Sequence, residues 1–134
     1  MGGRGAASYS SKLPYGSEYR EVHAFGNVKF LRKNDDSASP PMETRSSSSG
    51  RVYATVNNRD RIKHVTYYDE KGKRKRQIDI EFKNERYDIH VHRGYERPER
   101  DKRWPLTKHE EKKLERIQAE WKRHLESQQE KKGR

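Results

Sequence analysis

The segment Gln77–His92 constrains the fold more than any other part of this 134-residue chain. It contains two short runs in which polar and apolar residues alternate, separated by a polar turn at positions 84–85. Side chains along a β-strand point alternately to opposite faces, so each run is typical of a strand with one buried face. The apolar face carries Ile78, Ile80, Phe82, Ile89 and Val91, and the polar face carries Gln77, Asp79, Glu81, Asp88, His90 and His92. We therefore expect a half-buried hairpin whose polar face suits proton transfer or metal binding.

Two registers of this hairpin would bury the apolar face. A two-residue turn at positions 84–85 places Asp79 opposite His90. A four-residue turn over positions 84–87 places Asp79 opposite His92 instead. A slip of one residue would turn the polar face towards apolar partners, so the pattern excludes it. In either remaining register, a carboxylate lies directly across from a histidine.

The remaining patterns predict an α+β domain. Alternation indicates further strands at residues 52–56 and 62–68, which complete an antiparallel β-meander of about four strands. The T-x-x-E capping box from Thr107 to Glu110 predicts the start of a long C-terminal helix that reaches about Gln129. Its apolar residues form one stripe: Leu114, Ile117, Trp121 and Leu125. We expect this stripe to pack on the sheet, and a helix that binds a partner is the alternative.

Composition divides the chain into three parts. Residues 1–17, rich in Gly, Ser and Ala, predict a flexible tail, and residues 18–50 predict a hairpin followed by a Ser/Pro-rich linker. Residues 51–134 are expected to hold the compact domain. Charged residues make up 40% of the chain and apolar residues 28%, which limits the size of the core. The chain has no cysteine, signal-peptide core or membrane-length apolar run, so we expect a cytoplasmic protein that contacts no membrane.

The net charge of +11 predicts contact with nucleic acid. The densest basic run is K-G-K-R-K-R over residues 71–76, directly before the hairpin. A solvated turn with protective lysines is the alternative explanation for this run. The predicted nucleic-acid-binding residues are Lys73, Arg74, Lys75, Arg76, Arg93 and Tyr95.

The histidine pair suits RNA cleavage without a metal. One imidazole would remove the proton of the 2′-hydroxyl, and another group would protonate the departing 5′-oxygen. We assign this acid–base work to His90 and His92, with Asp79 orienting one of the rings. A cation such as Arg76, Arg93 or Lys63 would stabilise charge on the phosphate. Exposed sheet histidines without a catalytic role are the alternative.

Metal coordination by the same atoms is a further alternative. His90 and His92, with Asp79 or Glu81, supply three ligands and leave a position for water. We rank it below acid–base catalysis and expect neither a metal nor a cofactor. His64 can share the polar face of the sheet, whereas the other histidines are scattered.

Three motifs carry a resemblance to known families: Y-Y-D-x-x-G, Q-I-D-I and H-x-H-x-G-Y. They resemble the type-24 polymorphic toxin domain, which is predicted to be an RNase of the barnase–EndoU–colicin–RelE kind. Together with the first six residues, M-G-G-R-G-A, they also resemble small phage and prophage proteins of Firmicutes. The resemblance covers roughly residues 51–126 and implies an active site at Asp79, His90 and His92.

The chain departs from these relatives at two points. They commonly have a further histidine soon after I-D-I and a proline before H-x-H, whereas positions 81–85 hold no histidine and position 89 is Ile89. A protein that keeps this fold but has lost the catalytic activity would act as a non-catalytic, anti-CRISPR-like inhibitor of host defence. A structural accessory of phage assembly is a third hypothesis. The expected partners are RNA or DNA, or a host nucleoprotein complex in the bacterial cytoplasm.

Overall fold

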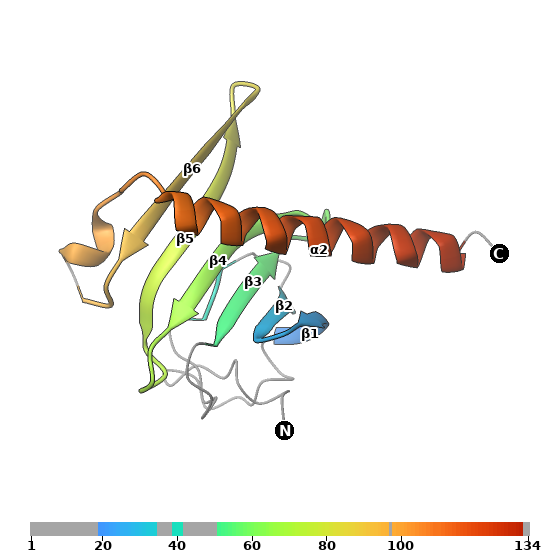
Figure 1. Ribbon diagram of the computed structural model, residues 1–134, viewed down its shortest axis with the longest axis horizontal. Helices are drawn as coiled ribbons and strands as arrows, with labels where there is room; N and C mark the ends of the chain where they lie inside the picture. The colour runs from blue at the N-terminus through green and yellow to red at the C-terminus, as the bar shows by residue number, and fades with distance from the viewer. Residues whose placement is uncertain (1–18, 35–38, 42–50, 97, 133–134) are drawn as a thin grey trace.

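The computed structural model describes residues 19–34, 39–41, 51–96 and 98–132, which form one sheet and one long helix. The strands lie in chain order across the sheet: β1 (Tyr19–Phe25), β2 (Val28–Lys33), β3 (Val52–Val56), β4 (Ile62–Tyr68), β5 (Arg74–Lys83) and β6 (Arg86–Arg93). A short 3₁₀-helix, η2 (Glu99–Asp101), precedes α2 (Lys108–Lys132). α2 crosses one face of the sheet, and its C-terminal part extends beyond the sheet (Figure 1). The predicted α+β class is confirmed.

The hairpin of β5 and β6 adopts the register with the two-residue turn. Asp79 pairs with His90 and Ile80 pairs with Ile89. Asn84 and Glu85 both have positive φ angles, 50° and 62°, as a tight hairpin turn with left-handed central residues requires. The register with the four-residue turn is therefore wrong. The like charges of Glu81 and Asp88 are left directly opposed on the polar face.

The sheet is larger than predicted, and its strands are not all antiparallel. It has six strands rather than about four, because the hairpin of β1 and β2 joins it. β2 runs parallel to β3, with Val28 beside Val52 and Phe30 beside Ala54, so the sheet is mixed. Parallel strands are joined by a long crossover and not by a tight turn, so no local sequence signal marks the pairing. The predicted tail at residues 1–17 and most of the predicted linker lie outside the described residues.

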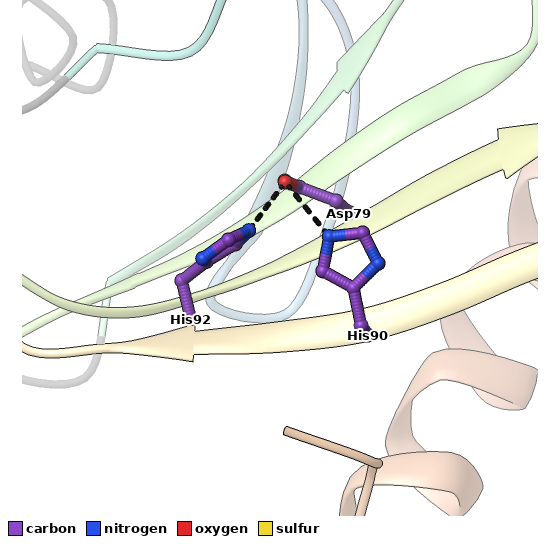
Figure 2. A group of neighbouring side chains, drawn as sticks. All are labelled: Asp79, His90 and His92. Carbon is purple, nitrogen blue, oxygen red and sulfur yellow. Dashed lines mark ion pairs between the residues drawn. The ribbon is translucent and has the colours of Figure 1, made fainter. Parts of the chain in front are cut away.

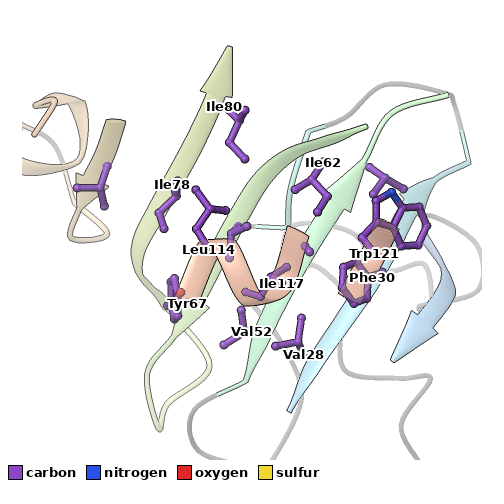
Figure 3. Packing of buried hydrophobic residues seen from close by; sticks show 14 residues of the cluster. Val28, Phe30, Val52, Ile62, Tyr67, Ile78, Ile80, Leu114, Ile117 and Trp121 are labelled. Carbon is purple, nitrogen blue, oxygen red and sulfur yellow. The ribbon is translucent and has the colours of Figure 1, made fainter. Parts of the chain in front are cut away.

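α2 packs on the sheet through the predicted apolar stripe. Leu114, Ile117 and Trp121 are buried against the strands, as Figure 3 shows. The Trp121 ring stacks on Phe30 with 5.1 Å between centroids, and its indole N–H donates to the backbone oxygen of Asp60 at 2.8 Å. The helix therefore supplies the cover that the apolar face of the sheet needs. Within the described part of the chain, no helix has the length and apolar character needed to cross a membrane.

Glu110 fixes the start of α2 to the sheet. The capping box is formed, because the backbone N–H of Glu110 donates to Thr107 Oγ1 at 3.2 Å and that of Thr107 donates to Glu110 Oε1 at 2.9 Å. The same carboxylate, which is only 1% exposed, also accepts hydrogen bonds from two arginines of β5 and β6. Arg93 binds both of its oxygens, at 2.9 and 3.0 Å, and Arg76 binds Oε2 at 3.2 Å.

Replacing Glu110 with alanine is expected to lower the free energy of unfolding by about 2–4 kcal/mol. The change removes a helix cap and leaves Arg76 and Arg93 without their carboxylate. The loss stays moderate because both arginines retain some contact with water. Urea denaturation of Glu110→Ala and Glu110→Gln measures it, and the glutamine variant should retain part of the cap. A loss no larger than that of Glu111→Ala, at an exposed neighbouring position, would contradict this role.

Candidate functional site

The face of the sheet opposite α2 carries three histidines around one carboxylate. His64 on β4 pairs with Asp79 on β5, which in turn pairs with His90 on β6. His92 lies two residues along β6 and therefore points to the same face as His90. We call these four residues the histidine cluster. Asp79, His90 and His92 were expected to meet here, and the structure brings them together.

The two oxygens of Asp79 have different partners. Oδ1 lies 2.7 Å from His64 Nδ1 and accepts a hydrogen bond from Gln77 Nε2 at 2.8 Å. Oδ2 lies 3.0 Å from His92 Nε2 and 3.5 Å from His90 Nε2 (Figure 2). One side of the carboxylate is thus held in place by hydrogen bonds, and the other side faces the H-x-H pair.

Asp79 is held in its ionised form. Burial would raise its pKa, but the hydrogen bonds from His64 and Gln77, with the charges of His64 and His92, outweigh burial and lower the pKa from 3.8 to about 2. The side chain is 14% exposed, so this is a largely desolvated negative charge. Such a charge orients the neighbouring imidazoles through its contacts with their ring nitrogens.

The lowered pKa of Asp79 predicts a loss of stability in acid. A carboxyl group whose pKa falls on folding stabilises the protein above its unfolded pKa, and this contribution disappears as the pH falls from about 4 to about 2. Over that range the wild type should lose on the order of 2 kcal/mol more stability than Asp79→Asn. Urea titrations of both proteins across this range measure the difference. Parallel acid curves for the two proteins would contradict it.

His90 is the most deeply buried member of the histidine cluster. Its side chain is 7% exposed, compared with 15% for His92 and 23% for His64. Both of its ring nitrogens are buried and have no hydrogen-bond partner. Their nearest acidic atoms are Asp79 Oδ2 and Asp88 Oδ1, each 3.5 Å away. His90 Nε2 therefore faces the cluster without a hydrogen-bond partner, so it is able to bind a ligand there.

Arg74 supports the cluster from the start of β5. This buried guanidinium donates to Gln77 Oε1 at 3.2 Å and to the backbone oxygen of Gly94 at 3.2 Å. Gln77 in turn donates to Asp79, so Arg74 fixes the orientation of the amide that holds the carboxylate. Burial lowers the pKa of Arg74. Arg74 was predicted to bind nucleic acid, but here it lies within the fold.

The other predicted nucleic-acid-binding residues fall into two groups. Arg76 and Arg93 share the face of Ile78 and Val91, beneath α2, and their guanidinium groups bind Glu110. The structure therefore does not bring them to the histidine cluster. Lys73, Lys75 and Tyr95 instead gather near the end of the hairpin that holds His92. The Lys73 ammonium lies 5.2 Å from the centre of the Tyr95 ring, and Lys75 is exposed beside Gly94.

His64 was predicted only to share the polar face of the sheet, and no catalytic role was assigned to it. Its position on the polar face follows from alternation, since Val65 and Tyr67 point to the core below α2. The predicted meander already made these two strands neighbours, and what the sequence did not supply is the register of β4 against β5 that sets His64 against Asp79. Lys63, which was considered as a phosphate contact, lines a groove beside Trp121 and Lys122 on the other face.

Comparison with known proteins gives no relative for this chain. No protein-family model matches it, and neither the curated proteins nor the solved structures yield a match. The resemblance to toxin domains and phage proteins therefore stays a prediction, and the histidine cluster is the feature of the chain that points to a function.

Proposed function

We propose that this basic protein acts on nucleic acid as an endoribonuclease in which histidines held by Asp79 transfer the protons. The observation that carries the proposal is the contact of 2.7 Å between His64 Nδ1 and the ionised Asp79. A carboxylate on Nδ1 fixes the ring and leaves Nε2 as the basic nitrogen. His92 contacts the other oxygen of the same carboxylate at 3.0 Å.

In this mechanism the two more exposed histidines divide the acid and base roles. His64 Nε2 accepts the proton of a ribose 2′-hydroxyl, whose oxygen then attacks the adjacent phosphorus. The Nδ1 atom of His92 is buried, so protonated His92 donates from Nε2, the nitrogen that faces Asp79 Oδ2 at 3.0 Å, to the departing 5′-oxygen. The products are a 2′,3′-cyclic phosphate and a free 5′-hydroxyl. Asp79 stabilises the positive charge that arises on His64. The buried His90 packs beside His92, with ring centroids 4.9 Å apart, and limits the movement of that ring.

Binding of the RNA is assigned to the basic end of the hairpin. Backbone bonding between Gly94 and Lys75 places the exposed ammonium of Lys75 two residues from the Gln77–His92 pair. Lys73 and Tyr95 lie at the same end and suit contact with a phosphate and a base, respectively. The phosphate that reacts would then lie beside His92.

The test is cleavage of total and structured RNA in the presence of EDTA. We expect wild-type protein to cleave, and His64→Ala and His92→Ala to lose at least about 100-fold in rate. His109→Ala is the matched control, since His109 is exposed on α2 and lies outside the cluster. Binding of RNA without any cleavage by wild-type protein would rule out the nuclease.

A non-catalytic inhibitor of host defence machinery is the second candidate. It is favoured by one observation, the binding of Arg76 and Arg93 to Glu110, which removes two expected cations from the histidine face. Cleavage usually relies on cations that stabilise the phosphate in the transition state. Persistent binding to nucleic acid or to a host complex, without cleavage, would select this function.

A further inference from the structure

We infer that the histidine cluster also binds a zinc-class divalent ion, through Asp79 Oδ2, His90 Nε2 and His92 Nε2. Ligand atoms from these three residues lie within 4.8 Å of one another. All three side chains project from neighbouring positions of β5 and β6 towards one point (Figure 2). The site goes beyond the proposed nuclease, because it needs only the geometry of the side chains and not the reaction.

The distances around Asp79 Oδ2 fit a tetrahedral ion. Ligand atoms that lie about 2.0–2.1 Å from such an ion lie about 3.3–3.4 Å from each other. The measured separations from Oδ2, 3.0 Å to His92 and 3.5 Å to His90, bracket this value. A modest approach of the two imidazoles would complete three sides of the coordination shell and leave the fourth position for water.

His90 provides independent support for a ligand at this place. Its side chain is 7% exposed, and neither ring nitrogen has a hydrogen-bond partner. Buried polar atoms are nearly always paired, so a buried nitrogen of this kind calls for an explanation. A metal ion on Nε2 would give a ligand bond to an atom whose only acidic contact in the described structure is the long one of 3.5 Å to Asp79 Oδ2.

The surroundings favour a cation that prefers nitrogen ligands. Two imidazoles with one carboxylate suit zinc and its first-row neighbours, whereas magnesium and calcium take oxygen ligands. Asp79 Oδ1 is held by His64 and Gln77, so Oδ2 is already oriented towards the site. The carboxylates of Glu81 and Asp88, opposed on the same face, add negative charge beside it.

Zinc binding would inhibit the proposed nuclease, and this part of the inference rests on the proposed function. A bound ion occupies the lone pair of His92 Nε2 and shares the carboxylate that orients His64. His92 could then no longer hold the proton that it donates to the departing 5′-oxygen. After EDTA has been removed from the protein and the RNA, cleavage should therefore fall as added zinc approaches one equivalent per chain.

Titration of the full chain with zinc against a chromogenic chelator tests the site. We expect one ion per chain, and His90→Ala should weaken binding by at least about 10–100-fold. His109→Ala is the control that removes an exposed histidine and should bind as wild type does. Wild-type protein loaded with cobalt should show the intense visible bands of tetrahedral coordination, which requires no variant to fold. No saturable binding, or binding that His90→Ala leaves unchanged, would overturn the site.

The same samples separate this inference from the nuclease. Tight zinc binding by a protein that never cleaves RNA would support the metal site and contradict the proposed function. Cleavage in EDTA by a protein that binds no zinc would support the proposed function and contradict the metal site. Cleavage that persists with zinc bound would overturn the inhibition.

Discussion

Replacing Asp79 with asparagine is expected to slow the proposed RNA cleavage by about 10²–10⁴-fold, the range that a positioned acid–base system contributes. Asparagine keeps the shape of the side chain but removes the charge that both His64 and His92 contact, at 2.7 and 3.0 Å. His64 would lose the partner that fixes its tautomer, and His92 would lose the contact that holds its ring in place. Because both roles fail together, this substitution should have the largest effect on activity.

A matched control separates the effect of the contacts between Asp79 and the histidines from the effect of the negative charge alone. Glu81→Gln removes one negative charge on the same strand and the same face, two residues from Asp79. Glu81 pairs with Lys83 at 3.1 Å and makes no hydrogen bond to a histidine. Single-turnover rates across pH should show the Asp79→Asn defect at every pH, with Glu81→Gln close to wild type. Equal defects in the two variants would mean that only the local charge matters and that Asp79 does not position the histidines.

Replacing Trp121 with alanine is expected to lower the free energy of unfolding by about 3–5 kcal/mol, the usual cost of removing a buried aromatic ring. Trp121 is 5% exposed, stacks on Phe30 of β2 and donates to the backbone of Asp60, so it links the helix to the sheet and to the turn between β3 and β4. Removing it leaves a cavity between α2 and the β1–β2 side of the sheet. For a small domain this is a large part of the total stability.

Two further variants separate packing from hydrogen bonding. Trp121→Phe keeps a stacked ring but loses the indole donor, so its cost should be about 1 kcal/mol plus the smaller packing loss. Lys122→Ala changes the exposed neighbour and should have little effect. Urea denaturation followed by far-UV circular dichroism measures all three. A loss below about 1 kcal/mol for Trp121→Ala would contradict a helix packed on the sheet.

The local parts of the fold could be predicted from the sequence. Alternation predicted that Ile78, Ile80 and Val91 face the core, but Phe82 on the same face is 51% exposed because it lies near the tip of the hairpin. The two-residue turn followed as one of two allowed registers. The capping box at Thr107 located the start of α2 within one residue of its observed position. These features depend on contacts between residues close in the chain, for which period and capping are direct signals.

The long-range parts could not be predicted in the same way. The parallel pairing of β2 with β3 joins segments separated by the long connection after Lys33, and no turn residue specifies it. Alternation already places Arg76 with Ile78 and Arg93 with Val91, away from the histidines. The sequence therefore held the signal that these arginines face α2, although their basic charge suggested a phosphate contact. Their partner Glu110 was recognised only as a helix cap.

The histidine cluster also combines a part that local sequence patterns predict with a part that depends on long-range pairing. The meeting of Asp79 with His90 and His92 follows from one hairpin and was predicted. The contribution of His64 required the pairing of β4 with β5 in the observed register. The absence of a histidine at positions 81–85 therefore does not leave the cluster with two imidazoles, because β4 supplies a third.

The most direct test of proton transfer by the histidine cluster uses one modified ribose. In EDTA, a cut made by the wild-type protein is mapped in a defined RNA, and the assay is repeated with that single ribose carrying a 2′-O-methyl group. Attack by the 2′-oxygen predicts that the cut disappears and that the unmodified product ends in a 2′,3′-cyclic phosphate. Cleavage that persists at the methylated ribose, or no cleavage of RNA that the protein still binds, would contradict the proposed function.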